Sequence, residues 1–460
     1  MRKCMMMKST LLVPLVLLVC AFFCSACLAE LKGGVGKVNI TPPLGGLLIG
    51  SKGYVSDDVL DELYAKVLVL NDGNKTVALV ACDLLYTPLE EITTPVRRIV
   101  KEKTGIPEQN ILVCATHTHS GPEVFTRSKL APEKIVKVSA VDRSFLATLV
   151  GKIASAVQLA HKNMQDVKIG SAKGQAPEVV YNRRPRDANG LVQMFYTLPP
   201  EVRATRKVVV DDDGHTRVTF TFPEGQMQRR FGPVDPAVRV LRVEDANGVL
   251  VGSLINFGCH PVTIYPYLST SISADYPAYA TGVVEKAEGG LCLFTLGLAG
   301  NAVPFDRGVV PRMQVGRAVG GEALKELQFL PTRDDITLDA IKKELVLPTK
   351  KPTPSQESES NDWPDHITTE LQVLRLGDIY ILGLPGEILV EVGLEIQKRA
   401  KMEKLFIFSL SNDAIGYVPH SAAYDEGGYE PGSATKLAKG AAEIMIEKAL
   451  DLIEQIKKEQ

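Results

Sequence analysis

The sequence predicts an α/β protein: a layered core of mixed sheets with flanking helices, in one large domain that carries a β-hairpin insertion. Two observations support this fold class. Apolar strand-like runs alternate along the chain with amphipathic helical segments, which is typical of layered α/β cores. The chain also has 460 residues, 45% hydrophobic and 23% charged, so it can bury a large core. This composition excludes a disordered or fibrous protein.

The first half of the chain contains the clearest strand and helix patterns. Two apolar runs, 61–71 and 76–85, flank the turn sequence NDGN and predict a pair of strands. Residues 89–104 have the apolar spacing of a helix, with Lys and Arg toward its end. The run 110–115 (NILVCA) predicts a buried strand, and residues 144–161 predict a second amphipathic helix.

Later segments predict a hairpin, a loop and a final helix. Period-two alternation over 206–222, around the turn sequence DDDG, predicts a hairpin, which we interpret as an insertion over about 205–223 that can border the functional site. Residues 348–366 are rich in Pro, Ser and Glu and predict a surface loop between strands. Residues 436–460 predict an amphipathic helix. No internal repeat is visible.

The N-terminal segment has the layout of a secretory signal. Basic residues precede an apolar run, and the small residues of 25–29 (SACLA) offer a cleavage site. We therefore expect a signal peptide over 1–29, a mature domain over 30–460 and an exported protein, secreted or periplasmic. An uncleaved anchor helix and lipid attachment at Cys27 are the alternatives.

Charge and cysteine content narrow the classes of partner. Removing residues 1–29 takes away three basic residues and no acidic ones, leaving 49 Lys+Arg, 54 Asp+Glu and a formal charge of −5. A mildly acidic chain lacks the excess of basic residues that binds the phosphates of nucleic acid. Cys82, Cys114, Cys259 and Cys292 each interrupt an apolar run, which predicts buried free thiols rather than a Cys-rich zinc site. A disulfide between two of them is the alternative.

The most informative motif is Thr116–Pro122 (THTHSGP), which follows the apolar run that ends at Ala115. If the strand continues into this motif, its period of two places the His117 and His119 rings on one face, and Gly121-Pro122 ends the strand. Paired imidazoles can divide metal binding and proton transfer between them. A polar loop after a core strand is the alternative, because two ligands alone do not make a site.

The same pattern occurs twice more. His260 follows an apolar run and precedes Pro261, and Glu387 follows the run 381–384 and a Pro-Gly turn. Two histidines and a glutamate at strand ends are the ligand set of a catalytic zinc that keeps one position open for water. A single residue of this kind would more often be a cap or a turn residue, but three in the same context favour a metal site.

Other polar residues have two readings. Asp83, at the end of an apolar run, can orient a ligand histidine or cap the following helix. Asp275 can support the site, but a helix N-cap is the favoured role. Four further histidines have helical, turn or loop contexts that predict solvated or structural roles, although His420 is close enough in sequence to Tyr417 to line a pocket: His161, His215, His366 and His420.

Together these motifs resemble the catalytic domain of the neutral/alkaline non-lysosomal ceramidase family. The resemblance extends from residues 35–43 (VGKVNITPP) to 428–430 (GYE), and THTHSGP is its most specific motif. It implies four zinc ligands: His117, His260, Glu387 and Tyr417.

The resemblance also implies catalytic roles for residues that do not bind the metal. His119, the second histidine of the motif, lies beside the metal in the catalytic pocket of this family. The family's Asn-Arg pair matches Asn182-Arg183, and a second pocket tyrosine matches Tyr429. The implied catalytic residues are therefore His119, Arg183 and Tyr429.

The chain departs from the family pattern in one motif. Where ceramidases have a serine once proposed as the nucleophile, the segment 299–305 (AGNAVPF) has Val303. Valine cannot be a nucleophile, so a serine mechanism is excluded and one that uses a metal-activated water remains. Ceramidases usually continue into a β-sandwich domain after the region that corresponds to residues 436–460, and we expect this sequence to represent the catalytic domain without it.

These observations predict a zinc-dependent amidohydrolase, ceramidase-like, that cleaves a linear amide C–N bond in N-acyl sphingosine or a related N-acyl compound. His119 would transfer the proton, and Arg183 and Tyr429 would stabilise the oxyanion. One alternative is a zinc-containing binding module without turnover, which Val303 favours. Another is a hydrolase of a non-lipid amide or ester without ceramidase activity.

The expected partner is a small-molecule or lipid amide, and nucleic acid is not expected. Peripheral contact with a membrane surface stays open. Only 6% of the residues are aromatic and Trp363 is the single tryptophan, so an aromatic membrane belt is not expected.

Overall fold

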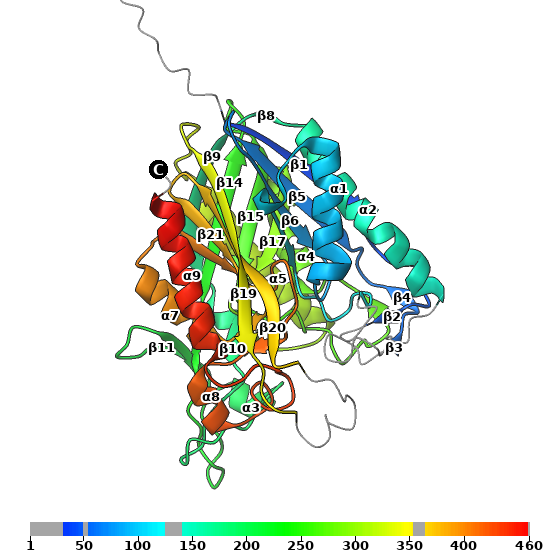
Figure 1. Ribbon diagram of the computed structural model, residues 1–460. Helices are drawn as coiled ribbons and strands as arrows, with labels where there is room; N and C mark the ends of the chain where they lie inside the picture. The colour runs from blue at the N-terminus through cyan, green and yellow to red at the C-terminus, as the bar shows by residue number, and fades with distance from the viewer. Residues whose placement is uncertain (1–30, 49–53, 125–139, 353–363, 459–460) are drawn as a thin grey trace, which may run out of the picture.

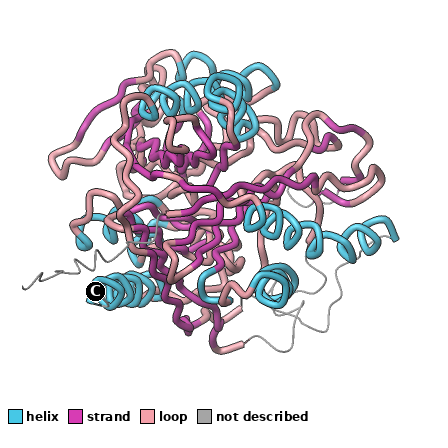
Figure 2. The backbone as a smooth tube through the Cα atoms, turned by 90° about the horizontal axis from the view of Figure 1, so that it is seen from above, coloured by secondary structure: helices cyan, strands magenta, loops and turns pink. Residues whose placement is uncertain are grey.

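The computed structural model describes residues 31–48, 54–124, 140–352 and 364–458 (Figure 1). The expected signal peptide, 1–29, lies outside these residues, as does 353–363 of the predicted surface loop. The α/β prediction is confirmed: mixed sheets lie at the centre of the molecule and helices lie around them (Figure 2). Within the described residues, no helix is both long and apolar enough to cross a membrane.

The first sheet is built from the N-terminal part of the chain. Its strand order is β7-β6-β5-β1-β8, with β6 and β7 parallel and the other neighbours antiparallel. Helices α1 and α2 cover its outer face. The elements are β1 (Lys32–Asn39), β5 (Tyr64–Asn71), β6 (Thr76–Cys82), α1 (Thr94–Thr104), β7 (Ile111–Ala115), α2 (Ala140–Lys162) and β8 (Gln165–Asp166).

The second sheet repeats this arrangement. Its order is β17-β15-β14-β9, again with one parallel pair, β15 and β17, at the edge. Helices α4 and α5 pack on it. The elements are β9 (Lys168–Gln175), β14 (Ala237–Glu244), β15 (Leu250–Phe257), α4 (Tyr276–Glu288), β17 (Leu291–Leu296) and α5 (Val309–Leu327).

The third sheet has the same form. Its order is β19-β20-β21-β23, and β21 and β23 are the parallel pair. Helices α7 and α9 contribute to the core on its outer side. The elements are β19 (Leu338–Pro348), β20 (His366–Leu376), β21 (Ile379–Gly383), α7 (Val390–Ala400), β23 (Leu405–Phe408) and α9 (Ala441–Lys458).

The described chain therefore repeats one topology three times, strand-strand-strand-helix-strand-helix, although the sequence shows no repeat. Each repeat contains one β-α-β crossover between parallel strands. The repetition is invisible in the sequence because a topology requires only apolar residues at the correct spacing, not the same residues. Corresponding strand ends of the three repeats lie at the same end of the molecule.

The inner faces of the three sheets share one core. Leu112 of the first sheet, Leu254 of the second and Leu374 of the third are all buried in it. β6 shows why such strands are continuously apolar: Leu79 faces this shared core, whereas Val80 faces the helices outside. A strand that is covered on both faces needs apolar residues at every position.

The predicted hairpin corresponds to β11 and β12, which pair with β13 in a small separate sheet. Short elements connect the repeats and complete the site. They are β2 (Leu47–Leu48), β3 (Tyr54–Val55), β4 (Asp58–Val59), η1 (Leu89–Thr93), η2 (Glu108–Asn110), η3 (Pro177–Val179), β10 (Val180–Asn182), α3 (Pro200–Arg203), β11 (Lys207–Val210), β12 (Thr216–Thr219), β13 (Pro233–Val234), β16 (Ser271–Ile272), β18 (Ala302–Pro304), β22 (Glu387–Ile388), β24 (Tyr417–Val418) and α8 (Ser421–Glu426).

The prediction for the cysteines is confirmed. The four cysteines that the structure describes are free and buried: Cys82, Cys114, Cys259 and Cys292. Burial raises the pKa of the Cys114 thiol to about 12 and that of Cys292 also to about 12. These side chains act as small core residues rather than as ligands or nucleophiles.

Candidate metal centre and cavity

Each repeat contributes one polar side chain to a common point. His117 follows β7, which ends at Ala115, and His260 follows β15, which ends at Phe257. Glu387 follows β21 after a Pro-Gly turn. The ends of the parallel strand pairs meet here, so three residues far apart in sequence lie together.

The path of the chain through the THTHSGP motif differs from the prediction. β7 ends at Ala115, and His117 has a φ of 71°, so the strand does not continue and its period of two does not align the rings. The left-handed backbone at His117 instead brings the rings of His117 and His119 to a centroid distance of 4.8 Å. Positive φ at a non-glycine residue costs free energy and is often retained at functional sites.

Backbone carbonyls fix the orientation of the two histidines. His117 Nδ1 lies 3.0 Å from the carbonyl oxygen of Leu85, and His260 Nδ1 lies 2.5 Å from that of Ala299. Because a carbonyl can only accept, each Nδ1 carries the hydrogen and each Nε2 presents a lone pair. The same second-sphere arrangement orients histidines that bind metals.

The lone pairs of the two histidines point toward the Glu387 carboxylate, and none of these three groups has a hydrogen to donate to the others. His117 Nε2 lies 3.2 Å from His260 Nε2, and both lie 3.2 Å from Glu387 Oε2. Tyr417 Oη is 3.3 Å from His260 Nε2. Donor atoms around a tetrahedral zinc, bound at about 2.0–2.1 Å, are separated by roughly 3.3 Å. The donor set and its spacing therefore fit a metal cation.

His119 belongs to the same cluster. Its Nε2 is 3.4 Å from His117 Nε2, and the ligating nitrogens of His117, His119 and His260 all lie within 4.8 Å of one another. The three histidines form a group that can hold a metal ion. The geometry places His119 within reach of the metal position as well as of the adjoining cavity.

Short parallel strands position the other two donor groups. Glu387 in β22 and Tyr417 in β24 are register partners. The segment around Gly300 packs closely against the backbone of β22. A glycine is needed there, because a Cβ at that position would lie 2.7 Å from the carbonyl carbon of Ile388. Tyr86 donates a hydrogen bond of 3.2 Å to Glu387 Oε1, which holds the carboxylate from its other side.

Burial and neighbouring charges set the protonation of these groups. Burial, aided by Arg183 and His117, lowers the pKa of His260 to about 4, and burial also lowers the pKa of His119. Burial alone would raise the pKa of Glu387, but His117 and His260 outweigh it and lower that pKa. Neutral imidazole and ionised carboxylate are the states that bind a metal.

A buried ion cluster holds Arg183 beside Tyr417. Arg183 donates from Nε to Glu430 Oε1 at 2.7 Å and from Nη2 to Tyr417 Oη at 3.1 Å. Arg184 donates to the other Glu430 oxygen at 2.6 Å. Glu430 is fully buried, so its two arginine partners must stay charged to compensate it. The cluster fixes both Arg183 and the Tyr417 phenol.

A cavity of about 450 Å³ opens beside this candidate metal centre. His119, His260, Arg183 and Arg307 contribute to its wall, with Leu85 and Val262 as the aliphatic part. Tyr429 is half-buried at this wall, and burial raises its pKa to about 12, so it remains a hydrogen-bond donor at neutral pH. Five tyrosines line the cavity: Tyr86, Tyr196, Tyr265, Tyr417 and Tyr429.

The structure thus brings all seven predicted site residues together around one point. Four residues that sequence reasoning did not assign to the site also belong to it: Tyr86, Arg307, Tyr196 and Glu430. They follow no periodic pattern, and each becomes visible only through its neighbours in space. The position of Glu430 directly after Tyr429 was the one available signal.

Several other candidates lie elsewhere. Asp83 accepts from the Tyr64 N–H and reaches neither His117 nor His260, and the N-cap positions of η1 and α1 are occupied by other residues, so neither role suggested for Asp83 is observed. Asp275 is the N-cap of α4, as favoured. His420 precedes α8 and does not line the cavity. The β11–β12 hairpin also contributes no residue to the cavity wall.

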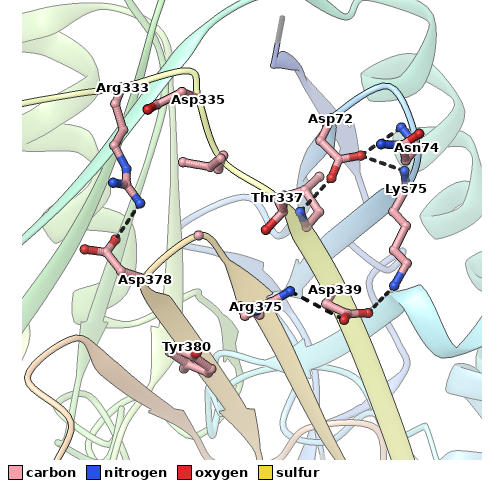
Figure 3. A pocket seen from close by; sticks show the side chains of 13 residues that line it. Asp72, Asn74, Lys75, Arg333, Asp335, Thr337, Asp339, Arg375, Asp378 and Tyr380 are labelled. Carbon is pink, nitrogen blue, oxygen red and sulfur yellow. Dashed lines mark hydrogen bonds and ion pairs between the residues drawn. The ribbon is translucent and has the colours of Figure 1, made fainter. Parts of the chain in front are cut away.

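A second cavity, of about 670 Å³, lies near the opposite ends of β6 and β21 (Figure 3). Three of its acidic side chains have partners: Asp339 pairs with Lys75 and Arg375, Asp378 pairs with Arg333, and Asp72 accepts hydrogen bonds from the backbone of Lys75 and Leu338. These interactions join strand turns of the first and third repeats, which indicates a structural role.

Comparison with known proteins finds sequence similarity to ceramidases over part of the chain. Residues 32–190 match the profile described as neutral/alkaline non-lysosomal ceramidase, N-terminal. Neutral ceramidase B of Dictyostelium discoideum is 26% identical over 264 residues, which cover 57% of this chain and 31% of that protein. The matched segment thus spans about a third of the curated relative's length.

Solved structures share the fold over nearly the whole chain. The neutral ceramidase from Pseudomonas aeruginosa superposes with a TM-score of 0.70 at 17% identity, covering 94% of this chain and 75% of that one. A ceramidase complexed with C2 superposes with a TM-score of 0.69 at 16% identity, covering 94% and 76% of the two chains.

Proposed function

We propose that this chain is a metal-dependent hydrolase that cleaves the amide bond of an N-acyl compound, because residues 32–190 match the neutral/alkaline ceramidase N-terminal profile and the fold resembles that of a neutral ceramidase. The single observation that carries the proposal is the meeting of two imidazole lone pairs and a carboxylate at 3.2 Å, beside an open cavity. A structural metal site would not need the cavity.

Four residues would hold the ion: His117, His260, Glu387 and Tyr417. Their nitrogen and oxygen donors favour zinc among the common metals. When bound, such an ion would supply Lewis-acid activation, which makes a nucleophilic water available near neutral pH. The chain's own residues then orient the substrate and move the protons.

His119 is the candidate for proton transfer. Hydrolysis adds a hydroxyl group to the acyl carbon and a proton to the departing nitrogen, so one group must carry a proton between these positions. His119 lies at the cavity wall and beside His117, and burial holds its pKa low, so the neutral ring can accept a proton and then release it. His119 as a further metal ligand is the competing role.

Arg183 and Tyr429 would stabilise the negative charge that develops on the acyl oxygen. Both line the cavity, and the Arg183 guanidinium carbon lies 5.9 Å from the centre of the Tyr429 ring. Preorganised donors of this kind contribute a few kcal/mol each to transition-state stabilisation. The Arg183 bonds to Glu430 and Tyr417 supply the preorganisation.

The substrate class follows from the family and the cavity. N-acyl sphingosine is the first compound to test, since the relatives are described as ceramidases. We also propose that residues 1–29 export the protein, which would allow it to meet lipids or other N-acyl compounds outside the cytoplasm.

The test combines metal analysis with hydrolysis. We expect about one zinc per chain, loss of it in His117→Ala and His260→Ala, and hydrolysis of at least one compound in a panel of N-acyl sphingosines, amino acids and amino sugars. His161→Ala, near the end of α2, is the matched control and should keep both metal and activity. Full zinc occupancy in both His117→Ala and His260→Ala would exclude the proposed metal site. Bound zinc without hydrolysis of any compound would favour a binding module.

A further inference from the structure

The cavity wall carries a second arginine that the proposed chemistry does not use. Arg307 lies between β18 and α5 and is only 7% exposed. Its guanidinium carbon is 5.5 Å from the centre of the Tyr196 ring, and Arg183 lies 5.7 Å from the same ring centre. Two arginines therefore face one cavity, with Tyr196 close to both.

Arg307 has no anionic partner among the described residues. Its Nε and Nη2 are buried without a hydrogen-bond partner, and Nη1 donates only to the backbone carbonyl of Tyr265, at 3.3 Å. Asp306, its neighbour in sequence, forms an ion pair with Arg203 instead. Burial, aided by the repulsion of Arg183, lowers the pKa of Arg307 and outweighs the opposing effects of Tyr181 and Asp275.

Arg183, unlike Arg307, has a carboxylate partner. Arg183 is also buried, but Tyr417 and the ion-paired Glu430 outweigh burial, so the pKa of Arg183 is raised. No Asp or Glu is among the residues that line the cavity in the described part of the chain. A buried cation without an ion-pair partner is costly, and an anionic ligand in the cavity would supply the missing counter-charge.

We propose that Arg307 binds an anionic group on the substrate, so that the natural substrate is an N-acyl compound whose amine part carries a carboxylate, phosphate or sulfate. The guanidinium can bind any of these oxyanions through two parallel hydrogen bonds. This inference rests on the proposed function and narrows it. It also moves the preferred substrate away from neutral N-acyl sphingosine.

The rest of the cavity agrees with a polar ligand. Five tyrosine hydroxyls and rings surround the space, and Leu85 and Val262 are the aliphatic residues among its lining groups. A pocket for a long neutral lipid would be lined predominantly by hydrophobic side chains. The excess of positive charge would attract an anion and repel an amine product that carried no acid group.

The experiment compares matched pairs of substrates that differ in charge. One pair is N-lauroylglycine and N-lauroylglycinamide, and the other is N-lauroyl-phosphoethanolamine and N-lauroylethanolamine, with release of lauric acid as the signal. We expect wild-type kcat/KM to favour the anionic member of at least one pair by about 10- to 100-fold, the usual strength of a hydrogen bond to a charged group. The pair that shows the larger preference identifies the oxyanion.

Arg307→Gln should remove this preference, and Arg307→Lys should keep part of it. Arg206→Gln is the matched control: its guanidinium lies over the Phe305 ring at 4.4 Å, outside the cavity, and the preference should be unchanged. Circular dichroism and zinc content confirm that each variant is folded. Equal preference in wild type and Arg307→Gln, or no preference in wild type, would overturn the inference while leaving the hydrolase proposal intact.

Calorimetric binding separates the two proposals if no compound is hydrolysed. N-lauroylglycine should then bind the wild-type protein at least 10-fold more tightly than it binds Arg307→Gln, and N-lauroylglycinamide should show no such difference. Binding without hydrolysis would refute the proposed function but support anion recognition. Equal binding to both proteins would refute the inference.

Discussion

At the scale of single residues, two hydrogen bonds decide what the site can do. The carbonyl groups of Leu85 and Ala299 hold the Nδ1 hydrogens of His117 and His260, and so both Nε2 atoms are left as lone pairs beside Glu387. The three contacts among His117 Nε2, His260 Nε2 and Glu387 Oε2 therefore join acceptors only. A bound cation would interact favourably with all three atoms.

His119→Ala distinguishes proton transfer from metal binding. If His119 transfers protons, we expect the variant to keep its metal and to lose about 10²- to 10⁴-fold in kcat, the usual contribution of a general acid or base. Metal analysis and steady-state kinetics on a verified substrate provide the measurement. An emptied metal site would make His119 a ligand, whereas unchanged metal and rate would make it structural.

Asp83 makes stability depend on pH. Burial, partly offset by Lys66, raises its pKa from 3.8 to about 6, so the folded state binds the proton more tightly than the unfolded state does. The associated stabilisation is present below about pH 4 and is lost as the pH rises through 6. The free energy of unfolding of Asp83→Asn, measured relative to that of wild type, should therefore be higher at pH 7.5 than at pH 4.5 by on the order of 2 kcal/mol.

Urea unfolding of both proteins at the two pH values, with chelator present throughout, provides the measurement. Asparagine can still accept the hydrogen bond that Asp83 accepts from the Tyr64 N–H. The same free-energy difference between variant and wild type at both pH values would show that Asp83 titrates normally.

At the scale of elements, short strands that come after the main sheets complete the site. β10 pairs with β18 so that Tyr181 opposes Val303, and Arg183 follows directly from β10. Val303 is fully buried and does not line the cavity. Val303, the residue that departs from the expected family pattern, therefore serves packing in this chain.

Val303→Ala tests this packing role. The truncation should destabilise the fold by about 1–3 kcal/mol through lost burial and a small void, and hydrolysis should stay within tenfold of wild type. Chemical unfolding measures the loss of stability, and steady-state kinetics measures the change in the rate of hydrolysis. A collapse in rate with the fold intact would show that the β10–β18 pair controls the chemistry and not only its support.

At the scale of the whole molecule, the candidate metal site lies where three repeats meet. His117 comes from the first, His260 from the second and Glu387 from the third, and the sheets behind them share one core. An ion bound at this point would tie the repeats together at the end of the molecule where their parallel strands finish.

Removal of the metal should therefore lower the thermal stability of the entire domain. At a metal concentration about 1,000 times its dissociation constant, binding stabilises the folded state by about 4 kcal/mol, which corresponds to a Tm change of roughly 5 °C in a domain of this size. Calorimetry with and without chelator should show one transition that shifts. His117→Ala should show no shift, and a shift of the same size in that variant would place the stabilising ion elsewhere.

The fold class, the main strands and helices and the free cysteines could be predicted from the sequence, and so could the histidines and the glutamate that the fold brings together. These features depend on local information: apolar spacing, turn residues, and histidines or a glutamate directly after an apolar run. The family motif added Tyr417, Arg183 and Tyr429, which local pattern alone did not identify.

Four features became visible only in the folded chain: the threefold topology, the left-handed turn at His117, the Glu430 ion cluster and the Arg307 guanidinium without an ion-pair partner. Each depends on which segments meet in space, and spacing along the chain does not encode those distances. Arg307 illustrates the reason: its sequence neighbour Asp306 suggests a local partner, but the fold directs that carboxylate to Arg203 and leaves the guanidinium at the cavity wall.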